Sequence, residues 1–227
     1  MNIDNCWYKN VCTNECRAGC VRYNCMRSLF LHSNIPESQW ILPQLKCGDN
    51  DLEAFKYLSN IESNISDWVD KGENIYIFSH SCGNGKTSWS IKLMQAYFDS
   101  IWHRSGFDCH GLFINVPAFL YTCKKSISQN VPGFDEILNK LDTVELVIWD
   151  DLPCSTFTGY EHQIILQYID SRINSGLANI FTGNCNREEC VPLIGDRLTS
   201  RIFGCSDIVE FVEGDKRGYY GRTSNTK

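Results

Sequence analysis

The sequence predicts an α/β protein in which a parallel sheet lies between helices and carries a phosphate-binding loop. Residues 75–90, which read IYIFSHSCGNGKTSWS, pass from an apolar run through a small-residue loop into an amphipathic segment. That is the strand, loop and helix order of a phosphate-binding loop. Residues 144–153, VELVIWDDLP, form a second apolar run that ends in two acids. A buried parallel strand delivers carboxylates to a site at its C-terminal end in this way.

The bulk composition fits one α/β core with a small appendage. The chain has 227 residues and a formal net charge of −6, so any binding of nucleic acid needs a local basic patch. The N-terminus is polar and lacks the apolar segment of a signal peptide. No apolar run approaches the ~20 residues of a membrane span. We therefore expect a soluble, cytoplasmic protein without a membrane partner.

The N-terminal stretch is rich in cysteine, with the spacing C-x5-C-x3-C-x3-C-x4-C. A unit this small buries no core of its own, and four thiolates can enclose a Zn²⁺ whose binding drives folding. We predict a metal-binding domain over residues 1–33. An iron–sulfur cluster is the alternative ligand, because it also takes four cysteines, and a short helix is the purely structural alternative. Four of the following five residues are the expected zinc ligands: Cys6, Cys12, Cys16, Cys20 and Cys25. The other cysteines are scattered and are interpreted as small apolar fillers.

Residues 34–50 are predicted to be a linker, because two prolines lie within 34–45. The main domain is expected over residues 51–227. It opens with helices over 51–58 and 61–69, where apolar residues recur at helical spacing. A turn over residues 70–74 leads into the strand before the phosphate loop.

The loop itself contains the expected phosphate contacts. Its backbone N–H groups and the helix N-terminus would hold phosphate oxygens. Lys86 would reach the β- and γ-phosphates, and the Thr87 hydroxyl would hold Mg²⁺. His80 occupies the first glycine position of the G-x-x-x-x-G-K-[ST] motif, and the sequence offers no physical reason for it. The predicted nucleotide contacts are Ser81, Cys82, Gly83, Asn84, Gly85, Lys86, Thr87 and Ser88.

Further elements follow the loop in α/β order. A helix is expected to about residue 102, a strand over 111–116, a helix from residue 117, and another over 134–141. After the strand at 144–153, Asp150 would coordinate Mg²⁺ and Asp151 would orient or activate the attacking water. A helix over 160–174 and a strand over 178–184 come next, and Asn184 could hold that water or the γ-phosphate.

The last predicted elements are a helix over 195–203 and a strand over 208–212. Arg197 and Arg201 are four residues apart and therefore lie on one helical face. An arginine near a subunit boundary can reach a neighbour's γ-phosphate as an arginine finger.

The ordered set of motifs resembles the AAA+ ATPases, in particular the DnaC/DnaI-type replicative helicase loaders, including those of phages and mobile elements. The resemblance covers most of residues 34–217. It rests on SHSCGNGKTSW, VELVIWDDLP, ANIFTGN and GDRLTSRIF followed by GDKR. It implies an AAA+ fold, and the few residues after Arg201 imply that no sizeable C-terminal helical lid follows.

The resemblance also implies roles for single residues. Lys86 and Thr87 match the P-loop positions, and Asn184 matches sensor 1. Arg201 matches the arginine finger, and Arg217 resembles sensor 2. The Walker B pair is matched by Asp150 and Asp151.

The function that the resemblance implies is ATP-dependent loading of a hexameric replicative helicase onto single-stranded DNA. ATP would lie between protomers of a homo-oligomer, and its hydrolysis would be slow. Lys124 and Lys125 are the candidates for DNA contact. Three alternatives stay open: an IstB-like transposase helper ATPase, a small-molecule P-loop kinase, and a zinc-dependent nucleic-acid-binding regulator with a degenerate ATPase.

Overall fold

The computed structural model describes residues 6–9, 11–13, 17, 19–42, 44–153 and 155–214. Within them the strands are β1 (Asn74–Phe78), β2 (Gly111–Asn115), β3 (Leu146–Asp150), β4 (Ala178–Gly183) and β5 (Asp207–Glu210). The first helices are α1 (Val21–His32), α2 (Leu52–Ser63), α3 (Ile65–Asp70) and α4 (Lys86–Ile101), with short 3-10 helices η2 (Glu37–Gln39) and η3 (Asp49–Asp51). The later helices are α5 (Val116–Ser126), α6 (Phe134–Leu141), α7 (Gly159–Asn174) and α8 (Arg187–Gly204).

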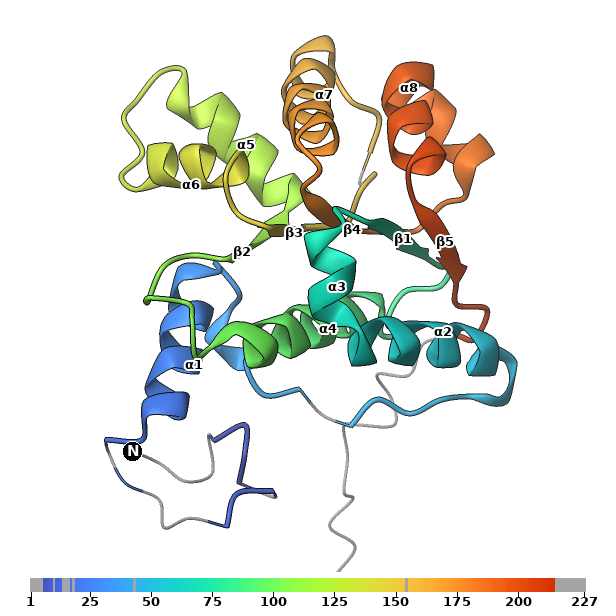
Figure 1. The fold of residues 1–227 in the computed structure, drawn as a ribbon. Helices are drawn as coiled ribbons and strands as arrows, with labels where there is room; N and C mark the ends of the chain where they lie inside the picture. Colours follow the sequence, from blue (N-terminus) through green and yellow to red (C-terminus); the bar gives the residue numbers. More distant parts are fainter. Residues whose placement is uncertain are drawn as a thin grey trace, which may run out of the picture.

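The strands form one sheet of five, in the order β2-β3-β4-β1-β5. Every neighbouring pair is parallel. Helices α1–α4 cover one face of the sheet and α5–α8 cover the other (Figure 1). The predicted α/β fold with a parallel sheet between helices is therefore confirmed.

The inner strands are buried along their whole length because helices cover both of their faces. β1, β3 and β4 contain no exposed residue, and their sequences are the near-continuous apolar runs that such strands require. Along β1, Ile75 and Ile77 join one hydrophobic cluster, whereas Tyr76 and Phe78 join the other. This alternation follows from the two-residue period of a strand.

Helix α1 packs on α4. Its buried residues Met26, Leu29 and Phe30 belong to the hydrophobic cluster between the sheet and α1–α4. The rings of Phe30 and Phe98 meet edge to face, with centroids 5.4 Å apart. Arg22 pairs with Asp99 on α4 at 2.5 Å. The described part of the N-terminal stretch thus shares its apolar core with the sheet domain.

A buried arginine fixes α7 to the neighbouring strands. Arg172 is fully buried, and its guanidinium donates to the carbonyls of Leu141 (2.7 Å), Val144 (2.9 Å) and Ala178 (2.7 Å). Its Nε donates to the side chain of Asn179 at 2.7 Å. Burial lowers the pKa of Arg172 to about 9. The hydrogen bonds from its Nε, Nη1 and Nη2 offset the cost of burying the charge.

Helix α8 begins earlier than the sequence predicts. The expected helix starts at residue 195, but α8 starts at Arg187, where Asn186 and Glu189 form a capping box. Pro192 lies inside the helix, and Gly195 has φ 76° and ψ 160°. The predicted helix is therefore only the second half of α8. Within the described residues, no helix combines the length and apolarity needed to cross a lipid bilayer.

Candidate nucleotide-binding site

The candidate site lies where β1, β3 and β4 end. Parallel strands direct their carboxyl ends to one edge of the sheet, so the loops that follow them meet there. A cavity of about 440 Å³ opens at this edge. It is lined by the phosphate loop 82–89, by the acids after β3, by the turn after β4, and by Leu45, Lys46 and Phe55.

The phosphate loop turns tightly around its own lysine. Gly83 and Gly85 have φ of 76° and 101°, a backbone conformation that favours glycine. Lys86 is 9% exposed, and its Nζ donates to the Ser81 carbonyl at 2.9 Å and to Asn84 Oδ1 at 3.2 Å. The ammonium group is therefore held at the centre of the loop, where it would meet phosphate oxygens.

The first turn of α4 meets the end of β3. The Thr87 hydroxyl donates to Asp150 Oδ1 at 2.7 Å, and Thr182 donates to the same oxygen at 2.8 Å. Mg²⁺ prefers hard oxygen ligands and keeps several of its waters, so a hydroxyl and a carboxylate that already touch fit this ion. The two residues predicted as magnesium ligands are thus brought together.

The second acid, Asp151, is held in an uncommon backbone conformation, with φ 65°. Its N–H donates to Thr182 Oγ1 at 3.1 Å, and Asn184 Nδ2 donates to its Oδ1 at 3.3 Å. Desolvation raises the pKa of Asp151, the neighbouring Asp150 raises it further, and Lys86 opposes both effects. Asp151 and Asn184 thus lie together, as predicted.

Sequence reasoning missed Thr182. Its hydroxyl is buried and connects both acids to β4, so it fixes the spacing between β3 and β4 at the site. The available signal was a hydroxyl residue two positions before Asn184 in an otherwise apolar run, since alternate strand residues share a face. The cavity residues Leu45, Lys46 and Phe55 were also missed, because they precede the loop by many residues.

The turn after β4 depends on a close backbone approach. Tyr76 donates its hydroxyl to the Cys185 carbonyl at 2.8 Å. A Cβ at Gly183 would lie 2.1 Å from the Tyr76 hydroxyl and 2.3 Å from the Leu152 carbonyl, so only glycine fits. This packing sets the direction in which the chain leaves β4 toward Asn184.

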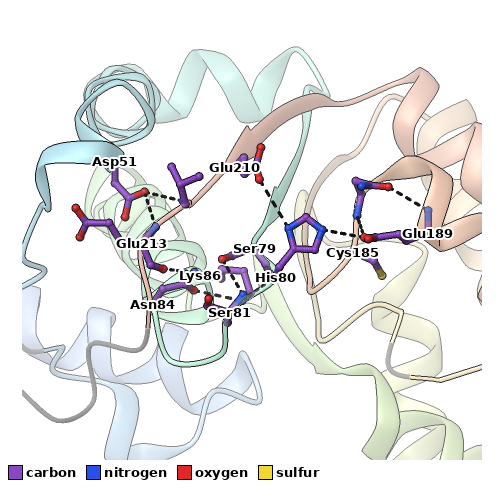
Figure 2. A network of polar contacts seen from close by, with 12 residues as sticks. Asp51, Ser79, His80, Ser81, Asn84, Lys86, Cys185, Glu189, Glu210 and Glu213 are labelled. Atoms are coloured by element: carbon purple, nitrogen blue, oxygen red, sulfur yellow. Dashed lines mark hydrogen bonds and ion pairs between the residues drawn. The ribbon is translucent and has the colours of Figure 1, made fainter.

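The chain after β5 passes beside the loop. The buried carboxylate of Asp51 accepts the backbone N–H groups of Val212 and Glu213 at 2.8 and 3.3 Å. The Glu213 carbonyl in turn accepts from Asn84 Nδ2 at 3.5 Å (Figure 2). The predicted sensor-2 residue, Arg217, lies outside the described residues.

The two arginines of α8 lie outside the cavity. Arg201 Nε is 2.6 Å from Asp170 Oδ1, and Arg197 Nη2 is 3.4 Å from Asp170 Oδ2. Neither residue lines the cavity of its own chain. The arginine-finger role that the sequence suggests for Arg201 therefore stays a prediction.

The predicted zinc site is not assembled in the described residues. Cys6 and Cys25 are buried, Cys12 is exposed and Cys20 is half-buried, whereas Cys16 lies outside the description. Any four of the five cysteines include at least three of the described ones. Among the described residues, no three His, Cys, Asp or Glu side chains gather in a group that could hold a metal ion. The cysteine spacing therefore does not translate into a tetrahedral site in this arrangement.

The chain was compared with known protein families and solved structures. No protein-family model matches the chain. A crystal structure of the DnaC helicase loader superposes with a TM-score of 0.59 at 16% identity, covering 75% of this chain and 93% of that one. AMPPCP-bound DnaA from Aquifex aeolicus superposes with a TM-score of 0.56 at 18% identity, covering 76% of this chain and 50% of that one. These likenesses, at under 20% identity, show that the chain shares its fold with the matched parts of both proteins.

Comparison with curated sequences identifies a relative of this chain. The replicative helicase loader DnaC of Escherichia coli (strain K12) is 27% identical over 150 residues, which cover 66% of this chain and 55% of the relative. The matched region thus spans little more than half the length of that curated relative. The resemblance to DnaC-type replicative helicase loaders, predicted from the motifs, is confirmed.

Proposed function

We propose that this chain is an ATPase that places a hexameric replicative helicase on single-stranded DNA. The observation that carries the ATPase part is the 2.7 Å contact between Thr87 and Asp150, beside the ammonium of Lys86 in one cavity. The similarity to DnaC supports the loader part. No observation of comparable weight favours a transposase helper or a small-molecule kinase.

In this proposal, Lys86 and the loop N–H groups bind the triphosphate. Thr87 and Asp150 would hold Mg²⁺, and the ion would supply charge neutralisation at the triphosphate. These two side chains supply the oxygen ligands, and Thr182 keeps the Asp150 carboxylate turned toward Thr87. Hydrolysis is proposed to be slow and to act as a switch.

Asp151 and Asn184 position the attacking water. A carboxylate beside a side-chain amide can accept a proton from the water while the amide orients it. The water oxygen then bonds to the γ-phosphorus as the bond to the bridging oxygen breaks, which yields ADP and phosphate. The raised pKa of Asp151 makes it a better proton acceptor than an ordinary aspartate.

The site is completed by a second copy of the chain. Arg201 is 42% exposed at its side chain and pairs with Asp170 outside its own cavity, so a neighbour's γ-phosphate could reach it by replacing that carboxylate. We assign Arg197 to the same interface and Arg217 to sensor 2. The homo-oligomer places one ATP at each junction.

The N-terminal residues 1–33 are proposed to contact the helicase, followed by residues 34–50 as the connection to the ATPase domain at 51–227. Lys124 and Lys125 on α5 are proposed to contact single-stranded DNA. Lys124 pairs with Glu161 at 2.8 Å, so DNA phosphates would have to replace that carboxylate as its partner. The resulting DNA affinity should fall steeply with salt concentration.

The proposal is tested by affinity capture from the native cell with ATP present, followed by a helicase-loading assay on circular single-stranded DNA. The expected result is capture of a hexameric helicase and ATP-dependent placement of it on DNA. Lys86→Ala is the matched control, since it leaves the rest of the chain intact and should abolish the nucleotide dependence. Capture of a transposase instead, or loading that is indifferent to the chain, would overturn the loader function.

Metal at the N-terminal cysteines stays a separate prediction. Elemental analysis with a visible spectrum decides it, because zinc is colourless and an iron–sulfur cluster is brown. A metal content well below one per chain would exclude both zinc and an iron–sulfur cluster. It would leave the proposed ATPase site unchanged.

A further inference from the structure

His80 links the phosphate loop to two other elements. Its Nε2 lies 3.0 Å from Glu189 Oε2 in the first turn of α8. Its Nδ1 lies 3.8 Å from Glu210 Oε1 at the end of β5. Figure 2 shows the imidazole between the two carboxylates. The loop after β1, the start of α8 and the end of β5 therefore meet at one side chain.

The backbone at His80 does not require glycine. Gly83 and Gly85 have positive φ, but His80 does not. A side chain at this position consequently causes no backbone strain. The imidazole packs edge to face against Phe78, with ring centroids 5.8 Å apart, which sets the direction in which it leaves the loop.

The acceptor of this bond is itself fixed. Glu189 Oε2 accepts the backbone N–H of Asn186 at 3.0 Å, and the Glu189 N–H donates to Asn186 Oδ1 at 3.0 Å. The capping box thus holds the carboxylate in one place. Asn186 follows Asn184 by two residues, so the start of α8 and the turn that contacts Asp151 are one short segment.

We propose that His80 is a positioning residue that couples the phosphate loop to the turn carrying Asn184, through its bond to Glu189. This proposal rests on the proposed ATPase function and deepens it. When the loop adjusts to a triphosphate, His80 carries the adjustment to Glu189 and hence to Asn184 and Asp151. Substitution of His80 should therefore lower kcat more than it weakens nucleotide binding, because the loop N–H groups and Lys86 are retained.

The contact adds little to folding stability. The side chains of His80 and Glu189 are 52% and 48% exposed, and exposed pairs of this kind contribute little. Variants at His80 should therefore fold, and thermal unfolding verifies this for each one. Two substitutions are informative: His80→Gly, which restores the usual residue of the loop motif, and His80→Gln, which keeps a side-chain donor.

The test compares kcat, KM and the Kd for a non-hydrolysable ATP analogue across these variants. We expect His80→Gly to lower kcat about tenfold, as small misplacements of reacting groups do, with Kd changed less than about threefold. His80→Gln should recover most of kcat. Glu189→Gln as a single substitution should lower kcat. In a chain that already carries His80→Gly it should lower kcat no further, since residues that act as one unit are non-additive. His103→Gln, at an exposed histidine remote from the loop, is the matched control and should leave kcat unchanged.

Hydrogen exchange gives a readout besides activity. Addition of the analogue should change the amide protection of residues 184–190 in the native chain, and this change should disappear in His80→Gly. An unchanged kcat in His80→Gly, additive effects with Glu189→Gln, or an unaltered exchange response would overturn the role of His80. A native chain that neither binds nor hydrolyses MgATP would instead overturn the proposed function, so the two failures are distinguishable.

Discussion

Arg201 and Asp170 form an ion pair between α8 and α7, with Nε 2.6 Å from Oδ1. The pair holds the guanidinium on the outside of the chain. A neighbouring copy that brings a triphosphate to this surface would compete with Asp170 for the same group. In the proposed oligomer, the Asp170 carboxylate would therefore hold the Arg201 side chain in place until a neighbouring copy binds.

Arg201→Ala should abolish ATP turnover, because the γ-phosphate loses a stabilising charge that is worth about 10³-fold or more. Nucleotide binding should change little. The measurement is a mixing experiment, in which Arg201→Ala and Lys86→Ala chains are each inactive and their mixture recovers part of the activity. Recovery requires one chain to supply the arginine and the other the phosphate loop, so a mixture that stays inactive would contradict the assignment.

Thr87→Ala should weaken binding of MgATP by about tenfold or more, an effect in the range found when groups around a metal are removed. Binding of ATP in the presence of EDTA should be nearly unchanged, since Lys86 and the loop amides remain. Isothermal titration with and without Mg²⁺ measures both values. Thr87→Ser keeps the hydroxyl that bonds Asp150 and should behave like the native chain; an equal loss in Thr87→Ser would refute the hydroxyl's role.

Asp151→Asn should lower turnover by about 10²-fold or more, because the amide cannot take the proton of the attacking water.

The same substitution should raise the melting temperature at neutral pH. Burial and Asp150 raise the pKa of Asp151 in the folded chain, so its ionised form is disfavoured there relative to the unfolded chain. The contribution of this carboxyl to the free energy of unfolding therefore falls as the pH rises from its ordinary pKa through the raised one. Asparagine also tolerates the positive φ at this position.

The pH dependence of unfolding checks the same residue. Without Mg²⁺, the melting-temperature gain of Asp151→Asn over the native chain should grow as the pH rises above the ordinary aspartate pKa of about 3.9. Thermal unfolding of the native chain and Asp151→Asn at several pH values measures this gain. Identical melting temperatures for the two at neutral pH would argue against the raised pKa.

Arg172→Met should destabilise the chain by about 3 kcal/mol or more, because each buried acceptor left without a donor costs about 1–3 kcal/mol. Removal of the guanidinium leaves the carbonyls of Leu141, Val144 and Ala178 without this donor. Chemical denaturation measures the loss. Arg27→Met, at an exposed arginine of α1, should change the free energy of unfolding by less than about 0.5 kcal/mol, and a comparable loss there would mean that burial is not the cause.

The sheet and the phosphate loop were predictable from the sequence because their signals are local. A parallel strand buried on both faces leaves a continuous apolar run. Asp150 and Asn184 stand at the ends of such runs, and Lys86 follows another across the phosphate loop. The first half of α8 was missed because Pro192 and Gly195 interrupt the helical pattern, while its start depends on the Asn186–Glu189 capping box.

Other parts of the site could not be read from the sequence because they depend on contacts between distant residues. His80 meets Glu189 and Glu210 only because β4 and β5 flank β1. Thr182 bonds Asp150 because β3 and β4 are neighbours in the sheet. The cysteine spacing in the N-terminal stretch suggested a metal, whereas its described residues are organised around aromatic packing, as in the stacked rings of Trp7 and Phe30.

The wall of the nucleotide cavity contains Leu45 and Lys46, which belong to the segment between α1 and α2. This segment therefore lines the candidate nucleotide site in addition to linking α1 to α2. Removal of the Leu45 and Lys46 side chains alone would open that side of the cavity, so a nucleotide held in the proposed site should dissociate faster.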